Sequence, residues 1–394
     1  MMSTAEEGSL TKIIRVIYPP YESKKRFERA LREFYISPKL RKYLEAGVKY
    51  SLIVKAMHLY GIDLSLRALK ELEVDKTLKR PSSVAEIAYY HDIEHTELLK
   101  TILDLLSVYG ILMRSGGRYL LNPLRREWKV RYPQKILEIV EKPLYKEIFD
   151  TLNFFGEQLV DVLLSGEPIL DYDKDAITAI EPINLSLPFT IFRLWAIQEG
   201  FYALYIRKLR KKKSAKILVF NSEAGYAIQN IFDFFKDWDL EAYVIDSSSR
   251  QAKLAETLIN ERGYNAHVLV YEYTKDIRKI SEIADAVETG GFDAAFIFNL
   301  WYWIEPNNRE KVLANISSVL KPEGIAIDLS FVRKAEDQPY GWEPAFYVVN
   351  RWVGIPYYET RRKLFMIYFE RIKEKRNSQV IKAEAPVERE VIIK

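Results

Sequence analysis

The sequence predicts an α/β fold class, in which a parallel sheet is wound on both faces by helices and is preceded by a mostly helical region. Three observations predict it. Apolar strand-like runs alternate with helical stretches between residues 216 and 330. The second of these runs ends in an acid, Asp246, about twenty residues after the first. Upstream of residue 214 the apolar residues recur mainly at helical spacing.

Five strands are expected in the sheet. They are 216–220, 241–246, 266–270, 292–299 and 324–330. A further strand-like stretch, 363–369, is expected to complete the sheet. Ligands of such sheets bind outside the carboxyl ends of the strands, where the strand order reverses. The loop Asn221-Ser-Glu-Ala-Gly-Tyr-Ala227 and the acid Asp246 are therefore predicted to face one crevice.

The predicted organisation has five parts. They are an N-terminal extension (1–22), a helical and winged-helix region (23–130), a helical bridge (131–213), the Rossmann-like sheet domain (214–373) and a mobile, charged tail (374–394).

The segment 82–121 predicts a helix, a second helix and a glycine-turn hairpin, which is the order of a winged helix. The second helix, from about His95 to Val108, presents Glu97 and Asp104 against the single base Lys100, with Glu94 just before it. Such a face repels a duplex, so a dimerisation or substrate-lid module is favoured over DNA binding. DNA binding through this module and the basic run 207–213 stays a further alternative.

Composition excludes several classes of function. The 394 residues are 48% apolar and contain no cysteine, which rules out disulfides, thiolate metal sites and cysteine nucleophiles. Of four histidines, only His91 and His95 have metal-ligand spacing, and they flank a predicted turn, so no metal is expected. A net charge of +4 does not demand a nucleic-acid partner. With no signal peptide and no apolar run long enough to span a membrane, we expect a cytoplasmic protein. The abundance of Lys, Arg, Glu, Ile and Tyr also fits a thermophile.

Together these segments resemble the class I S-adenosylmethionine-dependent methyltransferases. More narrowly, they resemble the O-methyltransferases that carry an N-terminal winged-helix dimerisation domain. The resemblance lies in Val84-Ala-Glu-Ile-Ala88, Leu103-Asp-Leu-Leu106, Gly110-Ile-Leu112 and Gly117-Arg-Tyr-Leu-Leu-Asn122, in the five strands, and in Leu320-Lys-Pro-Glu-Gly324 before the fifth strand. It implies a homodimer that binds S-adenosylmethionine and a small-molecule acceptor.

The resemblance also implies cofactor contacts. Asn221 stands for the family's acid, while Glu223, Gly225 and Ala227 stand for its three glycines. Glu223 is expected either to neutralise the cofactor's ammonium group or to fill the pocket. Asp246 is expected to accept the ribose hydroxyls, with a helix N-cap as the alternative. The remaining expected cofactor contacts are Glu272 and Tyr273 near the adenine, and Asn299.

At the position of the family's catalytic histidine stands Trp301, which cannot act as a base. Glu305 is the nearest substitute, and Tyr302 is a second catalytic candidate. Asn299 and Tyr302 also resemble part of an amino-methyltransferase motif. The predicted acceptor pocket consists of Trp195, Trp301, Trp303 and Trp342, and the alternative is that the tryptophans after the fourth strand are packing residues.

The leading hypothesis is methyl transfer from S-adenosylmethionine to a small or medium, largely apolar acceptor. The alternative is a catalytically degenerate methyltransferase fold that acts as a binding or regulatory protein.

Overall fold

A computed structural model of the chain describes residues 15–17, 50–125, 128–185, 193, 197, 213–331, 339–353 and 379–385. The chain divides into two compact units. One contains the described residues within Val48–Ser186 and Arg333–Pro356, and the other those within Met1–Gly47, Leu187–Val332 and Tyr357–Pro386. Two expected segments, the sheet-completing strand 363–369 and nearly all of the basic run 207–213, lie outside the described residues.

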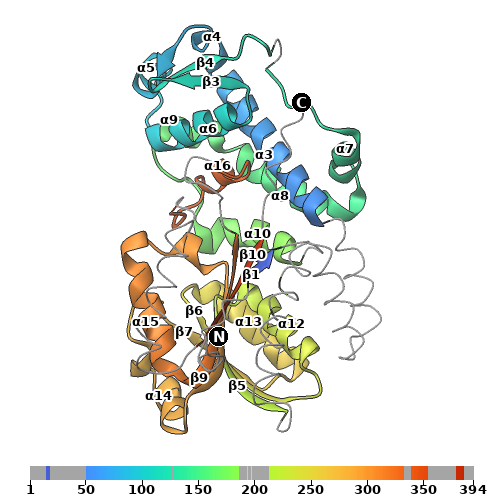
Figure 1. Cartoon of the computed structure of the whole chain (residues 1–394), viewed down its shortest axis with the longest axis vertical. Coiled ribbons are helices and arrows are strands. Elements are labelled where there is room, and N and C mark those ends of the chain that lie inside the picture. The colour runs from blue at the N-terminus through green and yellow to red at the C-terminus, as the bar shows by residue number, and fades with distance from the viewer. Residues whose placement is uncertain are drawn as a thin grey trace, which may run out of the picture. The chain divides into compact units, whose positions relative to one another are not determined.

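The second of these units is built on a seven-stranded sheet (Figure 1). Its order is β1-β10-β9-β8-β5-β6-β7, and every neighbouring pair is parallel. The strands are β1 (Arg15–Ile17), β5 (Ser214–Phe220), β6 (Asp239–Asp246), β7 (Ala266–Val270), β8 (Phe292–Phe298), β9 (Leu320–Phe331) and β10 (Gln379–Ala385). The chain adds β6 and β7 on one side of β5 and then β8 and β9 on the other. The order therefore reverses between β5 and β8, and the predicted doubly wound fold class is confirmed.

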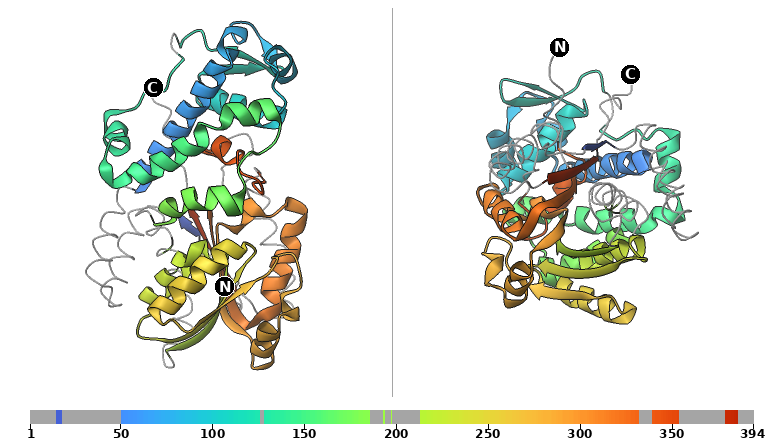
Figure 2. Two further views of the ribbon diagram at one scale, coloured as in Figure 1. Left: turned by 180° about the vertical axis from the view of Figure 1, so that it is seen from behind. Right: turned by 60° about the horizontal axis from the view of Figure 1, so that its bottom comes forward.

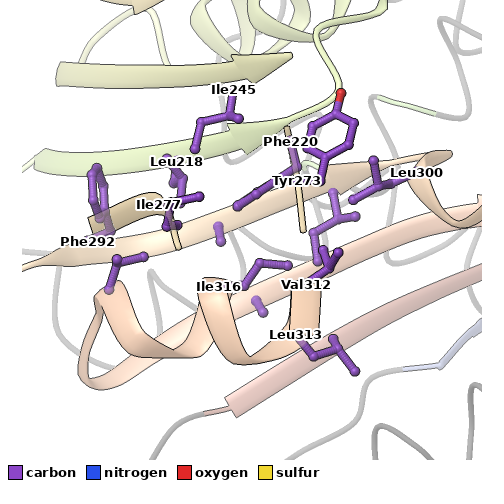
Figure 3. Close-up of a cluster of buried hydrophobic side chains, with 14 of the residues drawn as sticks. Leu218, Phe220, Ile245, Tyr273, Ile277, Phe292, Leu300, Val312, Leu313 and Ile316 are labelled. Atoms are coloured by element: carbon purple, nitrogen blue, oxygen red, sulfur yellow. The ribbon is translucent and has the colours of Figure 1, made fainter. Parts of the chain in front are cut away.

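Helices cover both faces of this sheet (Figures 1 and 2). They are α12 (Tyr226–Phe234), α13 (Ser249–Arg262), α14 (Ser281–Glu288) and α15 (Arg309–Val319). Short helices occupy Glu223–Gly225, Ile277–Lys279, Leu300–Trp303 and Pro306–Asn308. Successive strand residues point to opposite faces. On the face covered by α14 and α15, Leu218 and Phe220 of β5 join one apolar cluster with Val312 and Ile316 of α15 (Figure 3).

Two strands lie where none was expected. Strand β1 falls in the predicted N-terminal extension, and β10 falls in the segment predicted to be a mobile tail. Backbone hydrogen bonding accounts for both strands, because β10 pairs with the outer edge of β9 and β1 pairs with β10. An edge strand otherwise exposes unpaired N–H and C=O groups, and this need is not visible in a local sequence pattern.

The other unit is mostly helical. Its helices are α3 (Tyr50–Glu71), α4 (Val74–Thr77), α5 (Val84–Tyr90), α6 (Thr96–Val108), α7 (Gln134–Val140), α8 (Lys146–Gly156), α9 (Leu159–Ser165), α10 (Ile177–Leu185) and α16 (Glu343–Phe346). A 3₁₀ turn occupies Pro143–Tyr145 and a π-helical turn occupies Tyr172–Ala176. Its small sheet has the order β2-β4-β3, formed by Ser82–Ser83, Arg118–Leu121 and Leu112–Ser115.

The expected order of helix, helix and hairpin is present as α5, α6 and β3–β4. Ser83 and Glu86 form a capping box at the start of α5, which satisfies two backbone donors there. One expectation about α6 was wrong. Asp104, counted among the outward-facing acids, is buried and accepts hydrogen bonds from Tyr119 at 2.7 Å and Arg114 at 2.8 Å. Its carboxylate fixes the hairpin to the helix rather than facing a partner.

Candidate functional site

The loop after β5 keeps the backbone of a glycine-rich turn while carrying larger residues. Asn221, Glu223, Ala224 and Gly225 have φ angles of 66°, 47°, 56° and 95°. This left-handed region is costly for residues with a Cβ, and such strain often occurs at functional sites. The Asn221 side chain donates to the Phe298 carbonyl at 2.7 Å. The Asn221 backbone N–H donates to the Ile245 carbonyl at 3.1 Å. Asn221 therefore joins the ends of three strands.

The glycine and alanine of this loop serve packing. A Cβ at Gly225 would lie 2.9 Å from the Ala255 Cα of α13, so glycine lets the loop approach that helix. Ala227 is fully buried within α12. The Gly225 N–H also donates to the Ser222 carbonyl at 2.9 Å, which closes the loop.

Asp246 is buried at the carboxyl end of β6, beside the loop. Its Oδ2 accepts from the Ser222 backbone N–H at 2.9 Å and from the Ser222 hydroxyl at 2.6 Å. Its Oδ1 accepts from the Ser248 N–H at 2.9 Å. Burial raises the pKa of Asp246, and the hydrogen bonds to Ser222, Ser248 and the Tyr273 hydroxyl oppose that rise. The N-cap of α13 is Ser248, which accepts from the Gln251 N–H, so Asp246 itself is not the cap.

Glu223 points into a buried charged network. Arg193 Nη1 donates to Glu223 Oε2 at 3.0 Å, and the two side chains are 1% and 5% exposed. Asn299 Nδ2 donates to Glu223 Oε1 at 2.9 Å, and Arg193 Nε donates to Asn230 Oδ1 at 2.8 Å. Burial lowers the pKa of Arg193, while the Glu223 carboxylate opposes that change. Among the residues that the structure describes, no hydrogen-bond donor reaches the buried Oδ1 of Asn299.

Arg193 is the functional candidate that the sequence reasoning missed. The available signal was a lone charge within Phe189-Thr-Ile-Phe-Arg-Leu-Trp-Ala-Ile197, where a buried arginine requires an anionic partner. That partner is thirty residues away, and the strand order alone does not identify it.

The two residues expected to contact the adenine lie in different environments. Glu272 is exposed and pairs with Lys275 at 2.9 Å. Tyr273 is buried against Phe220 (Figure 3). Its hydroxyl bonds to Asp246. Only Tyr273 therefore contacts the polar group at the strand ends.

The catalytic and acceptor candidates are dispersed. Glu305 is exposed and accepts a hydrogen bond from Asn308, whereas Tyr302 is buried and Trp303 is partly exposed. Trp301 is fully buried and donates from Nε1 to Asp328 Oδ1 at 3.0 Å. Trp342 belongs to the helical unit, where its ring stacks on Tyr340 with centroids 4.4 Å apart. Trp195 lies outside the described residues.

Comparisons with known proteins agree with this architecture. Residues 223–328 match the model of the methyltransferase domain family. The chain is similar to the CurJ carbon methyltransferase, with a TM-score of 0.63, 13% identity and coverage of 87% of this chain and 90% of that one. It is similar to the CMeT domain of the citrinin polyketide synthase, with a TM-score of 0.57, 13% identity and coverage of 84% and 89%. No curated protein sequence matches.

The sheet order, the reversal between β5 and β8 and the domain match define a class I methyltransferase fold. Residues 223–328 therefore match a methyltransferase domain, and the sheet that contains them has the fold of known methyltransferases. Within the described part of the chain, no helix has both the length and the apolar character needed to cross a bilayer.

Proposed function

We propose that the protein transfers a methyl group from S-adenosylmethionine to a small or medium, largely apolar acceptor. The observation that carries this proposal is the meeting of Glu223, Asp246 and Asn299 at the carboxyl ends of three parallel strands, beside the reversal of strand order. This is the part of the sheet where such folds bind their ligands, and it lies within the methyltransferase domain match.

The residues present fit the charged end of this cofactor. Its methionine part carries a carboxylate and an ammonium group. The Arg193 guanidinium matches the first, and the Glu223 carboxylate with Asn299 Oδ1 matches the second. The fit at the ribose is less direct, because Asp246 is already bonded to Ser222 and Ser248. A ribose hydroxyl would take the place of the Ser222 hydroxyl on Oδ2.

When bound, the cofactor supplies a methyl group on a positively charged sulfur. The chain's contribution is to hold and align the two reactants, which alone lowers a barrier substantially. We assign Glu305 to receive the acceptor's proton, with Tyr302 assisting, since the indole of Trp301 cannot act as a base. Trp195 and Trp303 remain proposed for the acceptor pocket. Gly225 and Ala227 are proposed to shape the loop, and Glu272 and Tyr273 are proposed near the adenine.

Calorimetry of the full chain with S-adenosylmethionine tests the proposal. We expect saturable binding, and we expect Asp246→Ala to weaken it by roughly 10- to 100-fold, because hydrogen bonds to a charged group contribute about 1.5–3 kcal/mol. Absence of binding at millimolar ligand would remove the enzymatic function.

Ser222→Ala is the matched control, because it removes a loop bond to Asp246 while leaving the carboxylate in place. Its cofactor affinity should be unchanged or higher. If Ser222→Ala and Asp246→Ala weaken binding equally, Asp246 only anchors the loop.

A second candidate function is that of a binding or regulatory protein without catalysis. It is favoured by the burial of Glu223 and Asp246 and by their bonding to Arg193, Ser222 and Ser248. The same calorimetry separates the two candidates, since this one predicts no S-adenosylmethionine binding.

We also propose that the chain is a homodimer assembled through its helical unit. Exposed apolar side chains there, among them Met113 and Leu124, support this assembly. Light scattering should give twice the 46.2 kDa chain mass, and a monomeric mass at micromolar concentration would contradict it.

A further inference from the structure

Glu223 carries a large side chain at a position whose backbone conformation favours glycine. Its φ of 47° lies within a run of left-handed residues, and glycine would adopt that conformation without strain. The side chain is nevertheless buried and paired with Arg193 at 3.0 Å. The position therefore retains a strained, charged residue, which calls for a role beyond the loop's shape.

Stability does not supply that role. The desolvation cost of two buried charges commonly equals or exceeds their attraction, and an apolar pair of similar volume is often at least as stable. The Arg193–Glu223 pair is thus an expensive way to fill the space between the loop and residue 193. Asn230, which accepts from Arg193 Nε, adds a further buried polar group to the same cluster.

Asn299 provides an independent observation. Its Nδ2 donates to Glu223 Oε1, while its Oδ1 is buried and accepts no hydrogen bond from the described residues. A buried acceptor without a donor is destabilising, because it has lost its hydrogen bonds to water. Asn299 Oδ1 lies on the same side chain that contacts Glu223. A single donor group placed beside Glu223 would therefore satisfy Asn299 Oδ1 and bind the Glu223 carboxylate as well.

We propose that this cluster is a clamp for an α-amino-acid zwitterion and that Glu223 occupies the clamp until the ligand arrives. The ligand's carboxylate would replace the Glu223 carboxylate on Arg193. The ligand's ammonium would bind Glu223 and Asn299 Oδ1.

The exchange keeps every buried charge paired. One internal ion pair becomes two pairs with the ligand, and Asn299 Oδ1, to which no described residue donates, gains a donor. This rests on the proposed function, because the amino-acid end is taken to be that of the S-adenosylmethionine class of ligand.

Two probes isolate the clamp. S-adenosylhomocysteine carries the amino-acid end, whereas 5′-methylthioadenosine keeps the nucleoside and lacks that end. In calorimetry with the full chain, we expect S-adenosylhomocysteine to bind about 100-fold more tightly, as two charge-assisted contacts would give.

Two variants of the clamp then assign the difference. Arg193→Lys keeps the charge but loses the planar two-pronged geometry, and Asn299→Gly removes the amide while permitting the φ of 45°. Each should weaken S-adenosylhomocysteine binding about tenfold and leave 5′-methylthioadenosine unchanged. Arg278→Lys, in an exposed pair with Asp276, is the matched control and should change neither.

The outcomes are distinguishable. Equal affinity for the two probes overturns the clamp and leaves the proposed function standing. Binding of neither probe overturns the proposed function and the clamp together. If the variants weaken both probes equally, Arg193 and Asn299 only support the fold, and the clamp is overturned.

Discussion

Replacing Arg193 with methionine is expected to lower the free energy of unfolding by about 3–5 kcal/mol. Methionine fills a similar volume but removes the guanidinium, so the carboxylate of Glu223 remains buried with Asn299 as its hydrogen-bond donor. Urea unfolding of the full chain measures the loss as a lower midpoint.

A double-mutant cycle separates the interaction energy of the Arg193–Glu223 pair from the cost of leaving one charge buried without its partner. Glu223→Gln combined with Arg193→Met removes both charges, so the double variant should be more stable than Arg193→Met alone. Lys275→Met breaks the exposed pair with Glu272 and should change stability by less than about 1 kcal/mol. An Arg193→Met variant as stable as that control would show that the buried pair is not formed.

The sheet was predictable because its signals are local. The strand 266–270 was expected with the observed bounds, and the runs ending at Phe220 and Asp246 end where expected. Alternation of apolar strands and helices leaves few topologies, so the reversal of strand order between β5 and β8 followed as well. The meeting of Glu223 with Asn299 at the strand ends is a consequence of that topology.

What escaped prediction depends on pairing between distant segments. Arg193 meets Glu223 only through tertiary packing, and Ser222 meets Asp246 because the left-handed loop turns its hydroxyl and N–H toward the neighbouring strand. The sequence gives the residue types of these partners but not their distances. The same limit applied to Asp104, whose partners Arg114 and Tyr119 lie on the hairpin that follows its helix.

The helical unit has a close backbone contact whose disruption should also have a large effect. A Cβ on Gly341 would lie 1.8 Å from the His58 carbonyl oxygen of α3, and a Cβ on Gly61 would lie 2.3 Å from that of Gly341. The Gly341 N–H also donates to His58 Nδ1 at 2.8 Å. Two glycines therefore allow the segment around Tyr340 and Trp342 to lie directly on the helix.

Gly341→Ala is expected to lower the free energy of unfolding by about 3 kcal/mol, because the obstructing atoms are backbone and cannot rotate away. The control is Gly116→Ala in the hairpin turn, where φ is 55° and a Cβ meets nothing within 4 Å. It costs only the left-handed conformation, roughly 1–2 kcal/mol. Urea unfolding compares the two. Equal losses would mean that conformation rather than contact accounts for both, and that the approach of Gly341 to α3 does not hold the helical unit together.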